Sequence, residues 1–302
     1  MDVRRLRYFS VLAHELHFRR AAEVLCIAQP GLSKQIQILE SEIGARLFDR
    51  NSHGVTLTPA GRLLLEEGTP LLGQLERIAE RVRATAAERP PTLRIVHTRS
   101  VTGGVPDEAV ARYRLRHPDV DVLLDCAWTA RNVAMLRSGE VDAAFVRLPL
   151  DRTDDLEVLT MGDTELVVVL PEGHPLARRR ALDPSDLNGL PIVSWPRAQA
   201  PGYFDDLQAR LWAGQSPARV MWEPDPEHVL EAVASGSGIS VLDRQRALKL
   251  GPRGIVVRRF RVPVTGVFGV ACTAHAADTP VSDFLDICHA LTRTCHAGPG
   301  GR

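Results

Sequence analysis

The sequence predicts an α+β multidomain protein with a small helical head, one long linker helix and a larger C-terminal α/β part. Three observations predict this division. Apolar residues recur at helical spacing before residue 90, whereas β-rich runs alternate with helical stretches after residue 92. Pro90 and Pro91 end helical geometry between the two parts and mark a hinge. A chain of 302 residues with 44% hydrophobic content is long enough for two full-sized cores.

Composition excludes several classes of protein. The 37 basic and 37 acidic residues give no net charge, so the overall charge does not indicate a nucleic-acid partner. No uncharged apolar run approaches about 20 residues, and the N-terminus lacks the apolar stretch of a secretory signal. We therefore expect a cytoplasmic protein with no membrane partner. The five cysteines are scattered and odd in number, which argues against a disulfide framework or zinc knuckle and favours buried free thiols.

Two short helices are predicted at the start of the chain. Asp2 can cap the first, because its carboxylate can accept bonds from free backbone amides. The apolar stripe of this helix has helical period and consists of Leu6, Phe9, Leu12 and Leu16. Residues 18–25 form the second helix, where Ala21 and Ala22 allow a neighbouring helix to approach closely. Both stripes predict burial against further helices.

The stretch CIAQPGLSKQIQILE, Cys26 to Glu40, predicts a third helix with two different faces. Its apolar face consists of Leu32, Ile36, Leu39 and Ile43. Its opposite face is polar and consists of Pro30, Ser33, Lys34, Gln37 and Ser41. Hydroxyl and amide groups of this kind suit the donors and acceptors of base edges in a DNA major groove, but an ordinary solvated face is an equally good interpretation. A short helix, a tight turn and such a helix form a helix-turn-helix.

A small wing and a long helix follow. Residues 50–58 hold turn residues between short flanks, which predicts a two-stranded wing. Thr58 and Pro59 form a strong helix start, and the long helix extends to about Glu88. Pro70 should kink this helix or end its first half. Its narrow apolar seam predicts a partner helix in a second subunit and consists of Leu71, Leu75, Ile78 and Val82.

The head resembles a known family almost position by position. The motifs are FRRAA, AQPGLSKQI, LESEIGARLFDR and LTPAG, in order and at the family's spacing. They are similar to the winged helix-turn-helix of LysR-type transcriptional regulators. One departure is Ala28, where many members have Ser, a better helix cap. The resemblance implies that the third helix meets bases and phosphates through Gln29, Pro30, Ser33, Lys34 and Gln37, and that the wing touches DNA through Arg50 and His53.

The partners that the resemblance implies are double-stranded DNA, RNA polymerase and further copies of the chain. Two heads joined through the long helices would reach successive major grooves, so the DNA site should be pseudo-palindromic. The assembly is expected to be a homodimer or a homotetramer. The function implied is transcriptional regulation in response to a small-molecule effector.

The C-terminal part is predicted to form two α/β lobes with a ligand cleft between them. The β-rich runs are 92–97, 120–126, 141–147, 164–170, 191–195, 218–223, 238–243, 255–260 and 266–273. Their alternation with helices favours parallel sheets covered by helices. Segments such as LVVVLPEGHPLA and LEAVASGSGISVL are more loosely similar to the family, in which this half is a two-lobed α/β periplasmic-binding-protein-like effector domain.

The predicted domains follow from these observations and from the resemblance. The boundaries are 1–58 for the winged helix-turn-helix, 59–89 for the linker helix and 90–302 for the effector domain. Within the effector domain, lobe I is 92–161 with 268–302, and lobe II is 162–267. The chain should therefore cross between the lobes twice. A final helix near 281–294 should bury Phe284, Ile287, Cys288 and Leu291.

The resemblance also implies residues that line the cleft. They are Ser100, Thr102, Thr129, Arg147, Gly202 and Phe204. Hydroxyl groups and an arginine can hold a carboxylate, so we expect an aromatic acid or a muconate-like diacid as co-inducer, and no cofactor. Two alternatives stay open. Arg147 can instead pair with Asp142 or Glu227, and the Ser100 to Gly103 segment can be only a helix cap.

Two other functions were weighed. HELH at 14–17 resembles a zinc-protease motif, but its second His comes one position too early for both to share a helix face. SGSGIS near Gly236 lacks the third glycine of a dinucleotide fingerprint and stands between a helix and a strand in the wrong order. With no nucleophile elbow, P-loop or metal cluster, the sequence predicts no enzyme. A two-lobed solute-binding protein is disfavoured by the missing secretory signal and by the N-terminal head.

Overall fold

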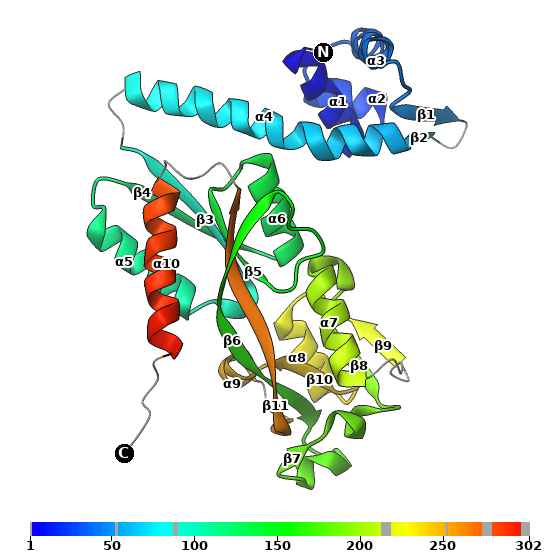
Figure 1. Ribbon diagram of the computed structural model, residues 1–302. Coiled ribbons are helices and arrows are strands. Elements are labelled where there is room, and N and C mark those ends of the chain that lie inside the picture. The colour runs from blue at the N-terminus through cyan, green and yellow to red at the C-terminus, as the bar shows by residue number, and fades with distance from the viewer. Residues whose placement is uncertain are drawn as a thin grey trace. The chain divides into compact units, whose positions relative to one another are not determined.

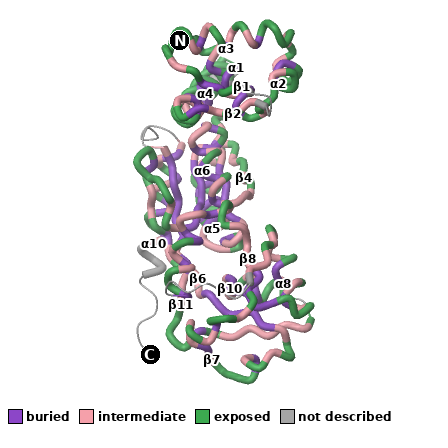
Figure 2. The backbone as a smooth tube through the Cα atoms, turned by 90° about the vertical axis from the view of Figure 1, so that its right-hand side faces the viewer, coloured by how far each residue is buried: buried purple, intermediate pink, exposed green. Residues whose placement is uncertain are grey.

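The computed structural model describes residues 2–51, 54–86, 90–212, 219–251, 253–273 and 280–296 (Figure 1). The chain divides into two compact units. The first is Met1–Pro90 with Arg137–Glu140, and the second is Pro91–Leu136 with Val141–Arg302. Each unit has its own buried core, drawn in purple in Figure 2.

The first unit begins with a head of three helices and a two-stranded wing. These elements are α1 Val3–Glu15, α2 Phe18–Val24, α3 Gln29–Ile43, β1 Phe48–Asn51 and β2 Gly54–Leu57. The strands pair antiparallel, with Phe48 opposite Leu57. The predicted helix-turn-helix and wing are therefore both present.

The predicted cap and most of the predicted stripe of α1 are observed. The Asp2 side chain accepts a hydrogen bond from the Arg4 backbone N–H at 3.1 Å, which satisfies one of the free amides of the first turn. Phe9 and Leu12 are fully buried and Leu6 nearly so, but Leu16 is 42% exposed. The prediction for Leu16 is wrong because α1 ends at Glu15, and Leu16 adopts the left-handed C-cap conformation with φ 48°.

The linker helix α4 runs over Pro59–Ala86, which at 28 residues is about 42 Å long. Thr58 Oγ1 accepts the Gly61 backbone N–H at 3.0 Å and so caps its first turn. Pro70 lies inside the helix and does not end it. The apolar seam is exposed in the single chain, at Leu71 50%, Leu75 44%, Ile78 50% and Val82 63%.

The second unit is built on a mixed sheet. Its strands are β3 Thr92–Thr98, β4 Asp121–Ala127, β5 Ala143–Arg147, β6 Leu156–Pro171, β7 Ala181–Leu182, β8 Pro191–Ser194, β9 Arg219–Trp222, β10 Ser240–Asp243 and β11 Ile255–Thr273. The main sheet has the order β10-β6-β11-β5-β3-β4, with β7 beside β11, and β8 pairs with β9. The expectation of parallel sheets is correct only for β3 with β4 and β5, for β7 with β11 and for β8 with β9.

The strands β6 and β11 are longer than predicted. β6 has 16 residues and β11 has 19, and the two pair antiparallel along most of their length. The runs 255–260 and 266–273 are thus one strand, with register shifts after Arg259 and Phe268. Both strands pass through the predicted lobe boundaries, and the long hydrogen-bonded ribbon that they form connects the two lobes.

Helices cover this sheet. The α-helices are α5 Val105–Arg116, α6 Thr129–Ser138, α7 Pro201–Trp212, α8 Pro226–Ala234, α9 Arg244–Leu250 and α10 Pro280–His296. Short 3-10 turns are η1 Arg99–Val101, η2 Pro175–Arg178, η3 Pro184–Leu187 and η4 Arg197–Gln199. The predicted stripe of α10 is buried, with Phe284 packed edge-on against Tyr113 and Phe145 in the core of lobe I.

The described cysteines differ in exposure. Cys272 and Cys288 are buried free thiols, as expected. Cys26 is exposed, and Cys126 is half-buried, so the expectation is wrong for Cys26. Cys26 follows α2 in the turn of the helix-turn-helix, where φ is 53°. Within the part of the chain that the structure describes, no helix has the length and apolar character needed to span a membrane.

Candidate nucleic-acid interface and ligand cavity

The third helix of the head presents a polar surface that the fold leaves open. Leu32, Ile36 and Leu39 are fully buried against the head's core, and this fixes the orientation of α3. The opposite side, which we name the recognition face, consists of Gln29, Pro30, Ser33, Lys34 and Gln37. All of these are exposed except Ser33, which is half-buried. The structure therefore places these five predicted DNA-contacting residues on one accessible side of one helix.

Other polar residues of α3 have structural partners. Gln35 Oε1 accepts a bond from Arg5 Nε at 3.2 Å, and Arg5 also pairs with Glu42 at 2.6 Å, so these contacts hold α3 against α1. Glu40 accepts the backbone N–H groups of Leu47 and Phe48 at 2.8 and 3.2 Å, which fixes the start of the wing. The polar residues Arg5, Gln35, Glu40 and Glu42, which hold the head together, are thus different from the exposed Lys34 and Gln37 of the recognition face.

The start of α3 and the wing are the other two parts of the predicted interface. Ala28 makes no side-chain cap, as expected, and Pro30 stands in the first turn. Arg50 lies in β1 opposite Val55, but only its backbone is described. His53 lies outside the described residues. The roles of Arg50 and His53 therefore stay predictions.

A cavity lies in the second unit, between the two predicted lobes, and the empty space within it, about 620 Å³, includes open solvent. Lobe I contributes Ser100, Trp128, Thr129 and Arg147, which follow or end the strands β3, β4 and β5. Lobe II contributes an aromatic and aliphatic wall with three polar groups, and its residues include Leu166, Trp195, Gln199, Tyr203, Val229, Val241, Asp243 and Arg246. A mostly apolar cavity with a few converging polar groups is typical of a small-molecule site.

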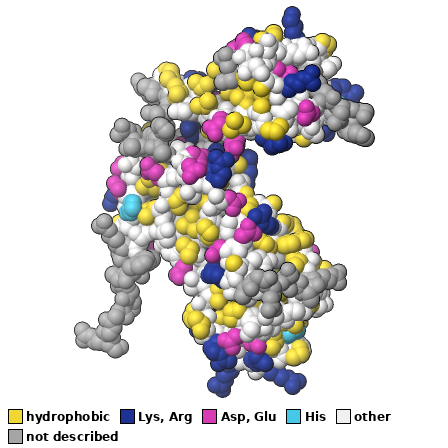
Figure 3. All heavy atoms as spheres, turned by 45° about the vertical axis from the view of Figure 1, so that its right-hand side comes forward, with side chains coloured by type: hydrophobic (Ala, Val, Ile, Leu, Met, Phe, Trp, Pro, Cys, Tyr) yellow, Lys and Arg dark blue, Asp and Glu magenta, His cyan; other side chains and the backbone are white. Residues whose placement is uncertain are grey.

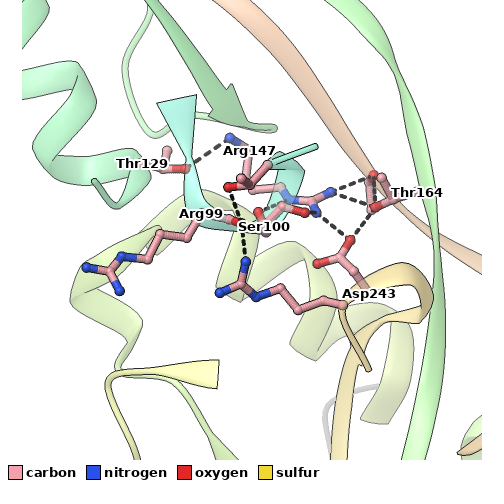
Figure 4. Close-up of polar contacts among 9 residues, drawn as sticks. Arg99, Ser100, Thr129, Arg147, Thr164 and Asp243 are labelled. Carbon is pink, nitrogen blue, oxygen red and sulfur yellow. Dashed lines mark hydrogen bonds and ion pairs between the residues drawn. The ribbon is translucent and has the colours of Figure 1, made fainter. Parts of the chain in front are cut away.

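Three of the predicted cleft residues, Ser100, Thr129 and Arg147, meet at this cavity (Figure 4). Ser100 and Thr129 lie 47 and 18 residues before Arg147 along the chain, and the three come from different elements. The fold brings them together because η1, α6 and the end of β5 lie at the carboxyl ends of neighbouring strands.

The other three predicted cleft residues do not line it. Thr102 is exposed and donates to the Arg99 carbonyl at 3.0 Å, which makes it the cap of a 3-10 turn. Gly202 stands at the start of α7, where an added Cβ would lie 2.7 Å from the Pro149 carbonyl oxygen, so it allows a close backbone contact. Phe204 lines a separate, smaller cavity. Trp195 forms a wall of both cavities.

Arg147 is buried and fully bonded. Its side chain is 3% exposed. The guanidinium donates to Ser100 Oγ at 2.8 Å through Nε, to Thr164 Oγ1 at 2.8 Å and Gly266 O at 3.0 Å through Nη1, and to Ser100 O at 3.4 Å through Nη2. Nη2 also donates to Asp243 in an ion pair. We name this cluster of Arg147, Ser100, Thr129, Thr164 and Asp243 the arginine network (Figure 4).

The alternative that paired Arg147 with Asp142 or Glu227 is therefore wrong. Asp142 accepts the Arg94 backbone N–H at 2.8 Å, and Glu227 pairs with Arg246 at 3.1 Å. The partner of Arg147 is Asp243 instead. Asp243 ends β10, which lies beside β6 in the sheet, and its carboxylate accepts a hydrogen bond from Thr164 of β6. The sequence separation of 96 residues between Arg147 and Asp243 hides this pairing from local patterns.

Two groups at this cavity, Arg147 and Tyr203, have raised pKa values. Burial disfavours the charged form of Arg147, but Asp243 stabilises it by charge and by hydrogen bonding, and the pKa of Arg147 is raised overall. Burial raises the pKa of Tyr203 to about 12, although the nearby Arg147 acts in the opposite direction. The Tyr203 ring lies over the guanidinium, 5.4 Å from its carbon to the ring centroid. At neutral pH the cavity therefore contains a charged arginine beside a neutral phenol.

Several cavity residues were missed by the sequence analysis. Trp195 and Asp243 end predicted strands, and Trp128 directly follows the observed strand β4. That position is itself a signal, because ligands bind in α/β proteins beyond the carboxyl ends of strands. Gln199 and Arg246 stand one short element further along, and no pattern in the sequence distinguishes them.

A head with an exposed polar helix, followed by an α/β unit with a mostly apolar cavity, is the combination typical of ligand-responsive DNA-binding proteins. On the face in Figure 3, basic and acidic side chains are interspersed, in agreement with the absence of net charge, so no broad basic surface is seen there. Affinity for DNA in such a protein depends on local contacts.

Comparisons with known proteins give the family. Residues 3–62 match the family model described as bacterial regulatory helix-turn-helix protein, lysR family, and residues 86–293 match the LysR substrate binding domain. The chain therefore belongs to the LysR family, whose members are transcriptional regulators that bind DNA and small-molecule effectors and are not enzymes.

Individual relatives cover most of the chain. The probable cat1 operon transcriptional activator of Acinetobacter lwoffii is 32% identical over 80% of both chains. The regulator BenM of Acinetobacter baylyi is 30% identical over 80% of both chains, and the crystal structure of full-length BenM has a TM-score of 0.59, covering 98% of this chain and 97% of that one at 26% identity. Full-length CbnR in complex with its target DNA has the same fold, with a TM-score of 0.65 at 20% identity, covering 96% of this chain and 100% of that one.

Proposed function

We propose that this regulator binds a pseudo-palindromic DNA site through the recognition face and responds to a small carboxylic acid bound in the cavity beside the arginine network. The effector is an aromatic or dicarboxylic acid from a catabolic pathway. Arg50 and His53 of the wing add contacts to phosphate or to the minor groove. The protein acts in the cytoplasm, where it contacts RNA polymerase at the promoter.

The observation that supports DNA binding is the accessibility of the recognition face. Gln37 and Lys34 are exposed, while the opposite side of α3 is packed in the core. A glutamine side chain can bond adenine through two hydrogen bonds, and a lysine can bond guanine or phosphate. The face therefore offers both sequence discrimination and charge neutralisation to a major groove.

The observation that supports effector binding is the chemistry of the cavity. Trp128, Trp195 and Tyr203 provide flat apolar walls, and the Trp195 and Tyr203 rings are nearly parallel with centroids 6.3 Å apart. Ser100 Oγ accepts a bond from Arg147 Nε at 2.8 Å, and Thr129 Oγ1 accepts the Arg147 backbone N–H at 3.0 Å, so the hydrogens of both hydroxyl groups are oriented away from these donors. Two hydroxyl donors near aromatic walls suit a ring that carries a carboxylate.

The exposed seam of α4 supports assembly. Four apolar residues at alternating spacings of four and three are left uncovered, which is the pattern of a helix that packs against a second copy. A dimer would place two recognition helices about 34 Å apart on successive major grooves. A homotetramer would cover two such sites. The effector would then change transcription by favouring one of two arrangements that it contacts differently.

A gel shift with the DNA upstream of the chain's own gene tests this function. We expect specific binding at nanomolar protein that weakens steeply as salt is raised, and a changed footprint when the effector is added. The double substitution Ser100→Ala with Thr129→Val should abolish the response to effector. Absence of salt-sensitive binding to any upstream fragment would refute the DNA-binding role, and an unchanged effector response in the double variant would refute the cavity's role.

A further inference from the structure

We propose that the cavity takes an aromatic acid with a single negative charge, and that Asp243 excludes ligands that carry a second one. This inference rests on the proposed effector function and narrows it to one chemical class. Asp243 is thereby a specificity-determining residue of the cavity, although its own bonds are to the protein.

Arg147 has no guanidinium N–H left to donate to a ligand. A guanidinium has five N–H groups. Those of Arg147 are directed at Ser100 Oγ, Ser100 O, Thr164 Oγ1, Gly266 O and Asp243 Oδ1. A ligand carboxylate can bond this guanidinium only by breaking one of these contacts, so Arg147 does not provide an anion site.

The negative charge of Asp243 disfavours a second ligand carboxylate. Its side chain is 13% exposed and belongs to the cavity wall, so it faces any ligand group placed near Arg147. Thr164 donates to the same carboxylate oxygen as Arg147 and holds it in place. A second ligand carboxylate directed toward this end would meet a fixed like charge in a partly desolvated site, which is strongly unfavourable.

The charged side chains of the cavity wall favour a ligand with one negative charge. Among the described residues that line it, the charged side chains are Arg147, Arg246 and Asp243, which leave one positive charge uncompensated within the wall. Arg246 is 18% exposed and pairs with Glu227, whose side chain is 47% exposed and so is screened by solvent. One ligand carboxylate, bound by the Ser100 and Thr129 hydroxyl groups in the field of Arg246, would neutralise this positive charge.

The remaining surface favours an uncharged ring. Trp128, Trp195, Tyr203 and aliphatic side chains make up most of the lining. Tyr203 stays neutral at physiological pH, because its pKa is about 12. The part of the ligand beyond its carboxylate therefore meets apolar and aromatic groups, with Asp243 as the acidic group of the lining.

Three probes that share one ring test the proposal: benzoate, terephthalate and 4-carbamoylbenzoate. Terephthalate carries two charges, whereas 4-carbamoylbenzoate has the same size and only one. Binding to the full chain is followed by tryptophan fluorescence, since Trp128 and Trp195 line the cavity, and by calorimetry. We expect the two monoanions to bind about tenfold or more tightly than terephthalate, a difference of about 1.4 kcal/mol.

The variant Asp243→Asn keeps an acceptor oxygen for Arg147 and removes the charge. We expect it to lose the preference for 4-carbamoylbenzoate over terephthalate or to reverse it. Asp205→Asn is the matched control, because Asp205 pairs with Arg197 in the same lobe, is exposed and does not line the cavity. The control should keep the wild-type preference.

Several results would overturn the proposal. They are equal or tighter binding of terephthalate to the wild-type chain, no binding of any of the three probes, or an unchanged preference in folded Asp243→Asn. If that variant does not fold, the wild-type comparison alone decides. The DNA gel shift is run in parallel: loss of DNA binding would refute the proposed regulatory function, whereas intact DNA binding without the charge preference would refute only this inference.

Discussion

The recognition face of α3 and the arginine network are both polar, but the protein uses them in opposite ways. Lys34 and Gln37 are exposed on a helix whose stability comes from the apolar residues on its other side. Arg147 is buried, and every N–H of its guanidinium is directed at an acceptor of the protein itself. In the head, the exposed residues proposed to bind DNA therefore differ from the buried apolar residues that stabilise the fold, whereas in the network Ser100 and Thr129, proposed to bind the effector, also accept bonds from Arg147.

Because of this difference, mutations in the two regions should have different effects on partner affinity and on the free energy of unfolding. Changes on the recognition face should alter affinity for a partner and leave the free energy of unfolding unchanged. Changes in the arginine network should alter both, because an unpaired buried charge is costly.

The largest loss of stability is expected for Arg147→Met. The substitution leaves the Asp243 carboxylate without its cation in a mostly buried site, which should lower the free energy of unfolding of the second unit by about 3–5 kcal/mol. Urea denaturation measures the loss. Arg197→Met, which breaks the exposed pair with Asp205, is the control and should have little effect. Adding Asp243→Leu to Arg147→Met should restore most of the stability, and wild-type stability of the single variant would contradict the account.

The next largest effect is expected for Ile36→Ala in α3. Ile36 is fully buried in the head's core, so its truncation leaves a cavity and should cost about 2–5 kcal/mol. The unfolding of the head, followed by circular dichroism, measures this loss. DNA affinity should fall only in proportion to the fraction of unfolded head. A variant with full stability but no DNA binding would show that this side of the helix contacts the partner.

Gln37→Ala changes the neighbouring residue and should give the opposite result. Because Gln37 is exposed, the free energy of unfolding should stay within experimental error of the wild type. Discrimination between the specific duplex and an unrelated one should fall by about 1–3 kcal/mol if the amide reads a base. Competition binding with both duplexes measures this difference. Equal discrimination by Gln37→Ala and the wild type would remove Gln37 from the base-reading set.

The smallest effect concerns the thiols at high pH. Burial raises the pKa of Cys288 to about 12 and, mainly through burial, that of Cys272 to about 11, from an ordinary value of 9.0. Both groups stabilise the fold fully below pH 9, and this contribution is lost as pH rises through about 11 to 12, because the unfolded chain ionises first. At pH 8, alkylation located by mass spectrometry should therefore modify exposed Cys26 readily and spare Cys272 and Cys288. Equal modification of all three thiols would contradict the burial.

The head was more predictable from sequence than the cavity, for a physical reason. The stripe of Leu32, Ile36 and Leu39 and the cap at Asp2 are local patterns, so spacing along the chain gives the buried face of each helix. The burial of Leu16 was predicted wrongly because Leu16 lies one residue beyond the end of α1, where the side chain no longer follows the helical stripe. Such errors are confined to the ends of elements.

The cavity depends on pairings between distant segments. Ser100, Thr129 and Arg147 were found through family resemblance, whereas Asp243 was not, because nothing local to residue 243 indicates that β10 lies beside β6. The fusion of two predicted strands into β11 was missed for the same reason, since partner strands determine where a strand ends. Sequence patterns give elements and their faces, and the sheet order then decides which side chains meet.

The salt dependence of DNA binding shows whether the exposed side of α3 contacts DNA. Fluorescence anisotropy of the upstream duplex is measured with the wild-type chain and with Lys34→Ala between about 50 and about 200 mM salt. The account predicts tight wild-type binding that falls steeply with salt, and weaker binding by Lys34→Ala with a log–log slope shallower by about 1. Identical affinity and slope for the two proteins would show that the exposed side of α3 does not meet DNA.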